Sequence, residues 1–329
     1  FAALAPGPMA HALASADSHQ MGAGHLSCVC GPAALAVAGP LGSNEKDMLA
    51  AYITGFEVMA RLAGGGPPGV GRSLHRRGLH PTSVFGRVGA AVVASVLMRL
   101  TPQQTEYAVG VAATTAGGLV GSFGTHAKPF HGGKAAMDGL LAADLAREGF
   151  ESATHLLDAE NGISGTLMQD HSIKIEPMEF TDGRALLRNA YKPYACCKAT
   201  HACVDAARKL SASVKPGLIQ RIVLGASPMT LAVAAKPNPQ TPLEGKFSVA
   251  YCASLGLAGY AAVESDFSDT RLRDPQLRAL IAKCEVAEQP GTELTEGFVE
   301  VHTSDGQKLR ADVPLALGNP GNPMSWTGM

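Results

Sequence analysis

The stretch that decides the fold is RVGAAVVASVLMRLTPQQ, residues 87–104. Residues 87–100 are apolar almost all round, which is typical of a helix buried inside a protein. A second helix is then predicted to begin, because Thr101 is a good N-terminal cap, Pro102 occupies the first helical position and Gln104 can reach back to the cap. Two helices with so short a join favour a helical body for this part of the chain.

Two further helices are expected nearby, over residues 47–62 and 134–148. Residues 117–133 are rich in glycine and polar side chains, which is typical of a loop that carries a functional site. The connections between the helical segments are short, and no internal repeat is visible. The first half of the chain is therefore predicted to be helical throughout.

The second half of the chain has a different pattern. Residues 218–224 alternate between apolar and polar side chains, as a half-buried strand does. Asp305-Gly306 is a strong signal for the turn of a hairpin. The expected elements are helices at residues 199–210 and 247–263 and strands at residues 218–224, 284–288, 297–302 and 308–314. The prediction is a mainly α protein in which an all-helical domain is followed by a smaller α/β (α+β) domain, with a boundary near Arg188.

The composition excludes several classes of function. Hydrophobic residues make up 46% of the chain and charged residues 17%, which favours a large buried core. The formal net charge of −1, without a long run of one sign, argues against a nucleic-acid-binding protein. No apolar run reaches the roughly 20 residues that a membrane-spanning helix needs. Seven cysteines, an odd number without the spacing of a zinc knuckle, indicate a reduced, cytoplasmic protein with no metal site.

His80 is the first candidate for chemistry. It lies between a flexible loop and the buried helix, and Pro81 biases its backbone away from helical geometry. Histidine is the side chain whose charge changes nearest neutral pH, which suits a general acid or base. The alternative interpretation is a histidine that fills the junction between loop and helix.

Residues 124–134, GTHAKPFHGGK, form the second candidate segment, with two histidines, two lysines and three glycines. Glycine lets a backbone and a ligand approach closely, and Lys128 could bind a carboxylate as a compact charge. A solvated loop explains the segment equally well. The pattern of a phosphate-binding loop is absent from it.

Two more segments carry possible site residues. Residues 191–201, YKPYACCKATH, fall at the expected domain boundary, where ligand sites are common, although a solvated linker is an equal alternative. Near the start of the chain, several histidines and one acid could be metal ligands, but their spacing matches no tight metal motif. They are His11, Asp17, Ser18, His19 and His25.

Taken in order, these segments resemble the MmgE/PrpD family, which includes 2-methylcitrate dehydratase, cis-aconitate decarboxylase and iminodisuccinate epimerase. Each match alone is weak, but five in one order span most of the chain. The matching pieces are His11-Ala12-Leu13 through His25, Gly78-Leu79-His80-Pro81-Thr82-Ser83, Lys128-Pro129-Phe130-His131-Gly132-Gly133, Tyr191-Lys192 through Thr200-His201, and Phe247-Ser248-Val249-Ala250-Tyr251.

The resemblance implies an architecture. It implies a helical domain over residues 1–187, an α/β lid domain over residues 188–319 and the start of a return to the helical domain over residues 320–329. The site would lie in the cleft between the domains of a homodimer, without metal or organic cofactor. Relative to the family, the chain lacks an N-terminal helical segment and the returning C-terminal helices, so we expect that both ends of a longer protein are missing.

The resemblance also implies a set of site residues. His80, Lys128, Lys192 and Tyr251 match residues that the family places in the site, and His25 and Ser18 match a further histidine and threonine. Asp17, Arg77, His131 and His201 are expected to contact substrate as well. One departure stands out, because Ala14 occupies the position of an acid that the family usually has there.

The implied activity is that of a cofactor-independent lyase acting on a small di- or tricarboxylic acid. Lys128 and Lys192 would hold the carboxylates and stabilise developing negative charge. His80 would be the general base or acid, and Tyr251 would donate a proton from the opposite face. A hydro-lyase such as 2-methylcitrate dehydratase is the first expectation; a decarboxylase and an epimerase are the alternatives. Ala14 leaves open a degenerate member that binds a metabolite without converting it.

Overall fold

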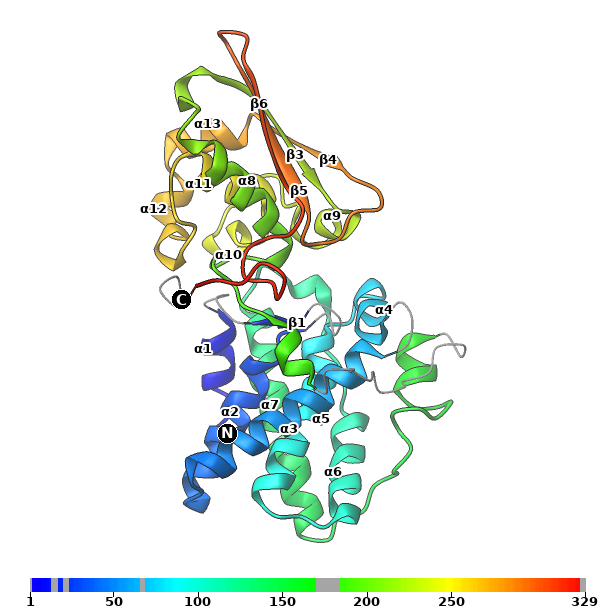
Figure 1. Ribbon diagram of the computed structural model, residues 1–329. Coiled ribbons are helices and arrows are strands. Elements are labelled where there is room, and N and C mark those ends of the chain that lie inside the picture. The colour runs from blue at the N-terminus through cyan, green and yellow to red at the C-terminus, as the bar shows by residue number, and fades with distance from the viewer. Residues whose placement is uncertain (1, 13–16, 20–23, 66–68, 170–183, 326–329) are drawn as a thin grey trace. The chain divides into compact units, whose positions relative to one another are not determined.

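The computed structural model describes residues 2–12, 17–19, 24–65, 69–169 and 184–325 (Figure 1). The chain divides into two compact units. Unit 1 comprises Phe1–Ala12, Ala16–Ser122 and His126–Ala190, and unit 2 comprises Leu13–Ser15, Phe123–Thr125 and Tyr191–Met329.

Unit 1 is a bundle of helices built around α5. Helix α5 packs against α2, α3, α6 and α7 and buries every residue except Val96, as its nearly continuous apolar sequence predicts. The helices are α1 (Pro6–Ala12), α2 (Ser27–Leu41), α3 (Glu45–Gly64), α4 (Val70–Arg76), α5 (Pro81–Leu97), α6 (Pro102–Thr114) and α7 (Ala127–Arg147). A two-residue pairing of β1 (Ser18–His19) with β2 (Asn189–Ala190) joins the two ends of the unit.

The helix start expected at Thr101-Pro102 is confirmed, and α3 begins at Glu45, two residues before the expected position. Thr101 and Gln104 form a reciprocal capping box at the start of α6, with Pro102 at the first helical position. Asn44 accepts a hydrogen bond from the backbone N–H of Asp47 at 2.9 Å, which caps α3. These bonds satisfy N–H groups that have no partner inside the helix.

The expected loop over residues 117–133 is wrong at its C-terminal end. Helix α7 begins at Ala127, so Lys128 and His131 lie in its first turns. The glycines that favoured a loop are instead contact points between helices. A Cβ atom on Gly133 would lie 2.2 Å from Pro8 Cδ and 2.4 Å from the carbonyl oxygen of Leu4, so only glycine allows α1 to approach α7 this closely.

Unit 2 contains a four-stranded mixed sheet with the order β4-β3-β5-β6. Its strands are β3 (Ile219–Ala226), β4 (Cys284–Glu288), β5 (Gly297–Thr303) and β6 (Lys308–Val313). Strand β4 runs parallel to β3, whereas β5 is antiparallel to both β3 and β6. The hairpin predicted at Asp305-Gly306 is confirmed, and Gly306 has a φ of 83°.

Helices cover one face of this sheet. The longer ones are α8 (His201–Ser211) and α11 (Val249–Leu257), which pack on each other and on the strands, with α13 (Pro275–Ile281) on the same side (Figure 1). Shorter turns complete the unit: α9 (Pro228–Ala234), α10 (Pro242–Gly245) and α12 (Asp269–Leu272). The helix expected to reach residue 263 ends at Leu257, because Gly259, with a φ of 85°, stops it two residues later.

Among the residues that the structure describes, no helix combines the length and the apolar character that crossing a membrane would require.

Candidate functional site

Unit 1 brings four histidines and one lysine together at one end of its bundle. We call His11, His25, His80, Lys128 and His131 the histidine–lysine cluster. Lys128 Nζ lies 2.9 Å from His11 Nε2, and His80 Nδ1 lies 3.0 Å from His131 Nδ1. The ring of His11 lies 4.9 Å from that of His25 and 5.9 Å from that of His80, centroid to centroid. Four segments that are far apart in the sequence therefore supply one compact group.

The local sequence of each segment explains its position. His80 is the cap residue of α5 in an extended conformation, as Pro81 requires. Its backbone N–H donates to the carbonyl of Gly118 at 2.9 Å, and its own carbonyl accepts from the N–H of Ser83. The backbone of His80 is thereby held on both sides, so its side chain points in a defined direction.

Hydrogen bonds fix the protonated nitrogen of two imidazoles in the cluster. His25 Nδ1 lies 2.7 Å from the backbone carbonyl oxygen of Asp17, which can only accept, so His25 Nδ1 carries the proton. Lys128, as an ammonium, can only donate, so His11 Nε2 accepts and the proton of His11 is on Nδ1. His80 and His131 share a single proton between their two Nδ1 atoms. His11 and one ring of the His80–His131 pair, whose nitrogens accept, are therefore neutral.

The electrostatics of the cluster agree with this assignment. Burial lowers the pKa of His80 well below its usual value, and the nearby positive charge of Lys128 lowers it further. Burial, then Arg87 and Lys128, also lower the pKa of His131. The pKa of His75 is lowered by burial and by Lys128. Burial and neighbouring positive charges therefore both favour the neutral form of these imidazoles.

An ion pair joins α5 to α7, the two helices at whose starts His80 and Lys128 lie. Arg87 Nε on α5 donates to Asp138 on α7 at 2.8 Å, and Arg87 Nη1 donates to the carbonyl of Ser83 at 2.7 Å. Both charged side chains are almost fully buried, and Lys134 also bonds to Asp138. These contacts tie α5 to α7 and so hold His80 and Lys128 at fixed positions.

The other expected site residues of unit 1 have structural contacts. The Asp17 carboxylate accepts from the Ser27 hydroxyl at 2.7 Å and from Asn189 Nδ2 at 3.0 Å, so it ties the start of α2 to β2. Ser18 is half-buried in β1, and Arg77 is exposed just after α4. Their expected contacts with substrate stay predictions. Ala14 lies outside the described residues.

The expected residues of unit 2 occupy different surroundings. Lys192 and Lys198 are both buried, and Lys198 donates to the carbonyl of Leu317 at 3.2 Å. Burial, together with the charge of Lys192, lowers the pKa of Lys198 to about 8. His201 is fully buried at the start of α8, with its ring 5.0 Å from that of Tyr194. Two cationic side chains therefore share one neighbourhood in this unit.

Tyr251 lies in the core of unit 2. Its side chain is fully buried against Phe267, and its hydroxyl donates to the backbone carbonyl of Asp266 at 2.7 Å. Burial raises the pKa of Tyr251. A role for this hydroxyl in proton transfer to a substrate stays a prediction, and it requires that the bond to Asp266 breaks.

Sequence reasoning placed His80, Lys128, His25 and His131 in one site, and the structure brings these four together within unit 1. It considered His11 only as a possible metal ligand and missed its contact with Lys128. The sequence did point to His11, because this residue begins the first segment that resembles the family. In the part of the chain that the structure describes, no three His, Cys, Asp or Glu side chains are grouped so that they could hold a metal ion.

Comparison with known proteins identifies the class to which this helical unit and α/β unit belong. The MmgE/PrpD N-terminal domain matches residues 1–176, and the MmgE/PrpD C-terminal domain matches residues 194–329. The chain belongs to the MmgE/PrpD family. The resemblance found in the sequence and the expected mainly α fold with a smaller α/β domain are thereby confirmed.

Several relatives of this chain are named cis-aconitate decarboxylase. The chain is 28% identical to the cis-aconitate decarboxylase of Aspergillus terreus over 333 residues, which cover 92% of this chain and 67% of the relative. It is 28% identical to the human cis-aconitate decarboxylase, covering 88% of this chain and 62% of the relative. For the mouse enzyme the identity is 29%, and the covered shares are 74% and 51%. The chain thus spans between about half and about two thirds of the length of these relatives.

Proposed function

We propose that this protein is a cofactor-independent lyase that acts on a small polycarboxylic acid by breaking a bond next to a carboxylate. The observation that carries the proposal is the position of Lys128, a buried lysine whose Nζ lies 2.9 Å from His11 Nε2 within a group of four histidines. A preorganised positive charge inside a protein binds an anion far more strongly than it would in water. The names of the relatives, cis-aconitate decarboxylases, support a tricarboxylate as the anion.

Decarboxylation is the reaction that the relatives favour. The carbon–carbon bond to one carboxylate would break, carbon dioxide would leave, and the electron pair would remain on the carbon and spread into the adjacent unsaturated acid. Lys128 would stabilise that negative charge. His80 would deliver a proton to carbon and recover one from water. A bound anion counteracts the effect of Lys128 on His80, which favours the protonated imidazole that this step needs.

The hydro-lyase that the sequence placed first remains the second candidate. A lowered pKa keeps His80 neutral at pH 7, and a neutral imidazole is ready to remove a proton next to a carboxylate. Loss of a hydroxide from the neighbouring carbon would then complete a dehydration, whereas return of the proton to the other face would give an epimerisation. The same first step therefore serves a dehydratase and an epimerase.

Further residues have proposed roles in binding. Lys192 is the second cation for a carboxylate, and His25, His131, Ser18, Asp17, Arg77 and His201 are proposed contacts of the substrate. Tyr251 is a proposed proton donor in a state in which its bond to Asp266 has opened. We propose a homodimer in the cytoplasm as well, which the family resemblance implies.

One experiment separates these reactions. The purified full-length protein is incubated in deuterated water with cis-aconitate, 2-methylcitrate or iminodisuccinate, and each reaction is followed by proton NMR. We expect cis-aconitate to lose one carboxylate and to gain one deuteron on carbon. Conversion of 2-methylcitrate to an unsaturated acid would instead establish a hydro-lyase, and deuterium exchange in iminodisuccinate without net conversion an epimerase. No reaction with any acid, together with measurable binding, would establish the degenerate metabolite-binding protein.

A further inference from the structure

The side chain of His11 lies against the reactive groups of the cluster without a role in the chemistry proposed above. It is 2% exposed, its Nε2 is 2.9 Å from Lys128 Nζ, and its ring lies against those of His25 and His80. Lys128 is itself 6% exposed. An ammonium on four rotatable bonds has many conformations, so a fixed acceptor restricts where its charge lies.

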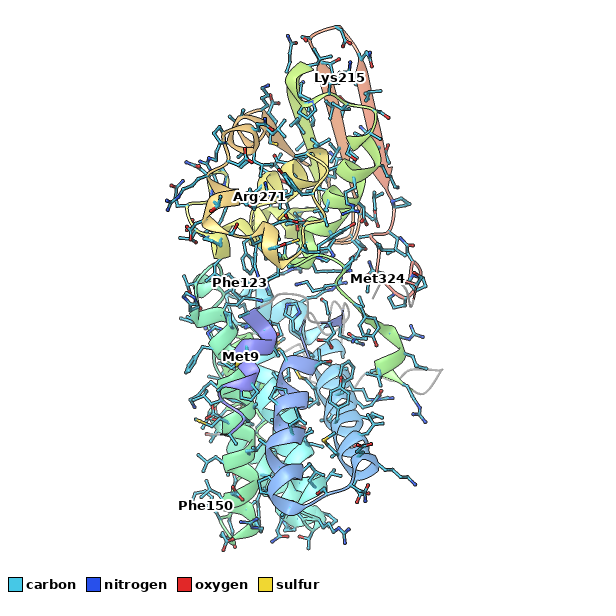
Figure 2. The ribbon with its side chains drawn as sticks, turned by 90° about the vertical axis from the view of Figure 1, so that its left-hand side faces the viewer. Met9, Phe123, Phe150, Lys215, Arg271 and Met324 are labelled. Atoms are coloured by element: carbon cyan, nitrogen blue, oxygen red, sulfur yellow. The ribbon has the colours of Figure 1, made fainter. Side chains whose placement is uncertain are left out.

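A close approach of α1 to α7 places His11 next to Lys128. Gly7 is one helical turn before His11 on α1, and a Cβ atom on Gly7 would lie 2.3 Å from Gly133 Cα on α7. Gly133 is in turn five residues after Lys128. The backbones of α1 and α7 therefore touch at a pair of glycines, next to the contact between His11 and Lys128. Figure 2 shows Met9 on α1 beside the first half of α7 and Phe150 beyond the end of α7.

We infer that His11 is a positioning residue, whose neutral Nε2 accepts the hydrogen bond that aims the Lys128 ammonium at the anion. The inference rests on the proposed function in one respect, namely that Lys128 binds a carboxylate. An imidazole suits this task because it accepts a hydrogen bond without cancelling the positive charge. A carboxylate in the same place would form an ion pair with Lys128 and compete with the bound anion.

This role requires a particular protonation state of His11. The proton must be on Nδ1, because Nε2 has to accept from Lys128. A second proton on the ring would remove the acceptor and place two positive charges side by side. Among the described residues, titratable groups that face His11 include His25 before α2, His80 at the start of α5 and Lys128 on α7, and His131 in turn contacts His80.

The first test observes the protonation state directly and needs no ligand. The protein is labelled with 15N-histidine, and long-range 1H–15N spectra are recorded at about pH 7.5, where an ordinary imidazole is neutral. The His11 signals are assigned by their loss in His11→Gln. We expect an unprotonated Nε2 and a protonated Nδ1 in His11, and a change in both shifts in Lys128→Met. A protonated Nε2 in the unmodified protein would overturn the inference.

The second test separates the acceptor from the volume of the side chain. Calorimetry measures the affinity for propane-1,2,3-tricarboxylate, a saturated acid that has no double bond to react. Because a hydrogen bond to a charged group is lost, we expect His11→Leu to bind about tenfold more weakly, and His11→Gln, whose amide oxygen can accept, to lose clearly less. Equal losses, or a smaller loss for leucine, would show that His11 only fills space. His19→Leu, at a buried histidine that donates to the Ala185 carbonyl, is the matched control for the loss of a buried ring.

The two failures are distinguishable. If the unmodified protein binds neither this tricarboxylate nor cis-aconitate, the proposed function fails, and the spectra still decide whether His11 accepts from Lys128. If the unmodified protein binds the acid and His11→Leu binds it equally well, the positioning role alone is wrong.

Discussion

Lys128 of unit 1 differs from two lysines of unit 2 in what it contacts. In unit 2, the buried Lys246 donates to the carboxylate of Glu264 at 2.6 Å, and the half-buried Lys283 donates to the carbonyl of Ile219 at 2.6 Å. In unit 1, Lys128 contacts an imidazole, and two further imidazoles contact each other. Carboxylates and carbonyls satisfy an ammonium and stabilise a fold. A neutral imidazole is a titratable acceptor, so this contrast separates two lysines bonded to carboxylate or backbone oxygens from a lysine in contact with histidines.

The Arg87–Asp138 pair shows that the contrast is not simply one between the units. It lies within unit 1, on α5 and α7, at whose starts His80 and Lys128 lie, yet its charges are matched and well bonded. Unit 1 therefore contains two kinds of buried charge. The Arg87–Asp138 pair fixes α5 to α7, and Lys128 is held in the cluster by these fixed helices. The predictions below test this division, beginning with the largest expected effect.

Replacing His80 with glutamine tests the cluster most severely. Loss of a general acid or base typically lowers the rate by a factor of about 100 or more, so we expect kcat to fall by at least about that factor. The measurement is the initial rate with whichever acid the unmodified protein converts. Unchanged kcat would remove His80 from the chemistry, and a normal unfolding curve for the variant serves as the control.

Replacing Arg87 with methionine tests the structural pair. Asp138 would stay buried without its main partner, and breaking a buried pair in this way costs about 3–5 kcal/mol. The free energy of unfolding in urea measures the loss. Arg147→Met is the control, because Arg147 pairs with Asp144 at the exposed end of α7, where we expect a change below about 1 kcal/mol. Similar losses in the two variants would contradict the structural role of Arg87.

Replacing Tyr251 with phenylalanine tests whether unit 2 uses its hydroxyl for structure. Because the bond to the Asp266 carbonyl is lost, we expect the free energy of unfolding to fall by about 1–3 kcal/mol. Because Tyr251 is also the proposed proton donor, we expect kcat to fall by about 100-fold or more. A change in kcat below about tenfold, with the same loss of stability, would contradict that role and leave the hydroxyl a structural one.

The histidines predict how stability depends on pH. Burial lowers the pKa of His19, His80 and His131 in the folded state below the value of 6.5 that applies to the unfolded chain. Below pH 6.5 the unfolded chain therefore binds more protons than the folded one, so stability falls as the pH falls. We expect a lower Tm at about pH 5.5 than at about pH 7.5, and a smaller difference in His80→Gln. An equal or higher Tm at the lower pH would contradict the neutral cluster.

Local features of the fold could be predicted from the sequence. Helix α5, the cap at Thr101 and the hairpin at Gly306 each depend on a few neighbouring residues, and all three are confirmed. The start of α7 could not be predicted, because Gly132 and Gly133 favour a loop when no partner is known. The need for glycine at Gly133 comes from its contact with α1, which is more than one hundred residues earlier in the chain.

The residues of the candidate site could be proposed from residue type and family resemblance, but their contacts could not. His80 and Lys128 were proposed because a histidine before a proline and a lysine in a glycine-rich segment have recognisable chemistry. The bond between His11 and Lys128 joins residues 117 positions apart, and no local pattern encodes it. The bond that engages the hydroxyl of Tyr251 likewise depends on how α11 packs within unit 2.

The central claim is that the charge of Lys128 binds a polycarboxylate, and calorimetric titration with cis-aconitate tests it most directly. The unmodified protein is compared with Lys128→Met and with Lys283→Met, which removes a half-buried lysine bonded to a carbonyl. We expect Lys128→Met to bind at least about tenfold more weakly and Lys283→Met to bind as the unmodified protein does. Equal affinity for the unmodified protein and Lys128→Met would contradict the account.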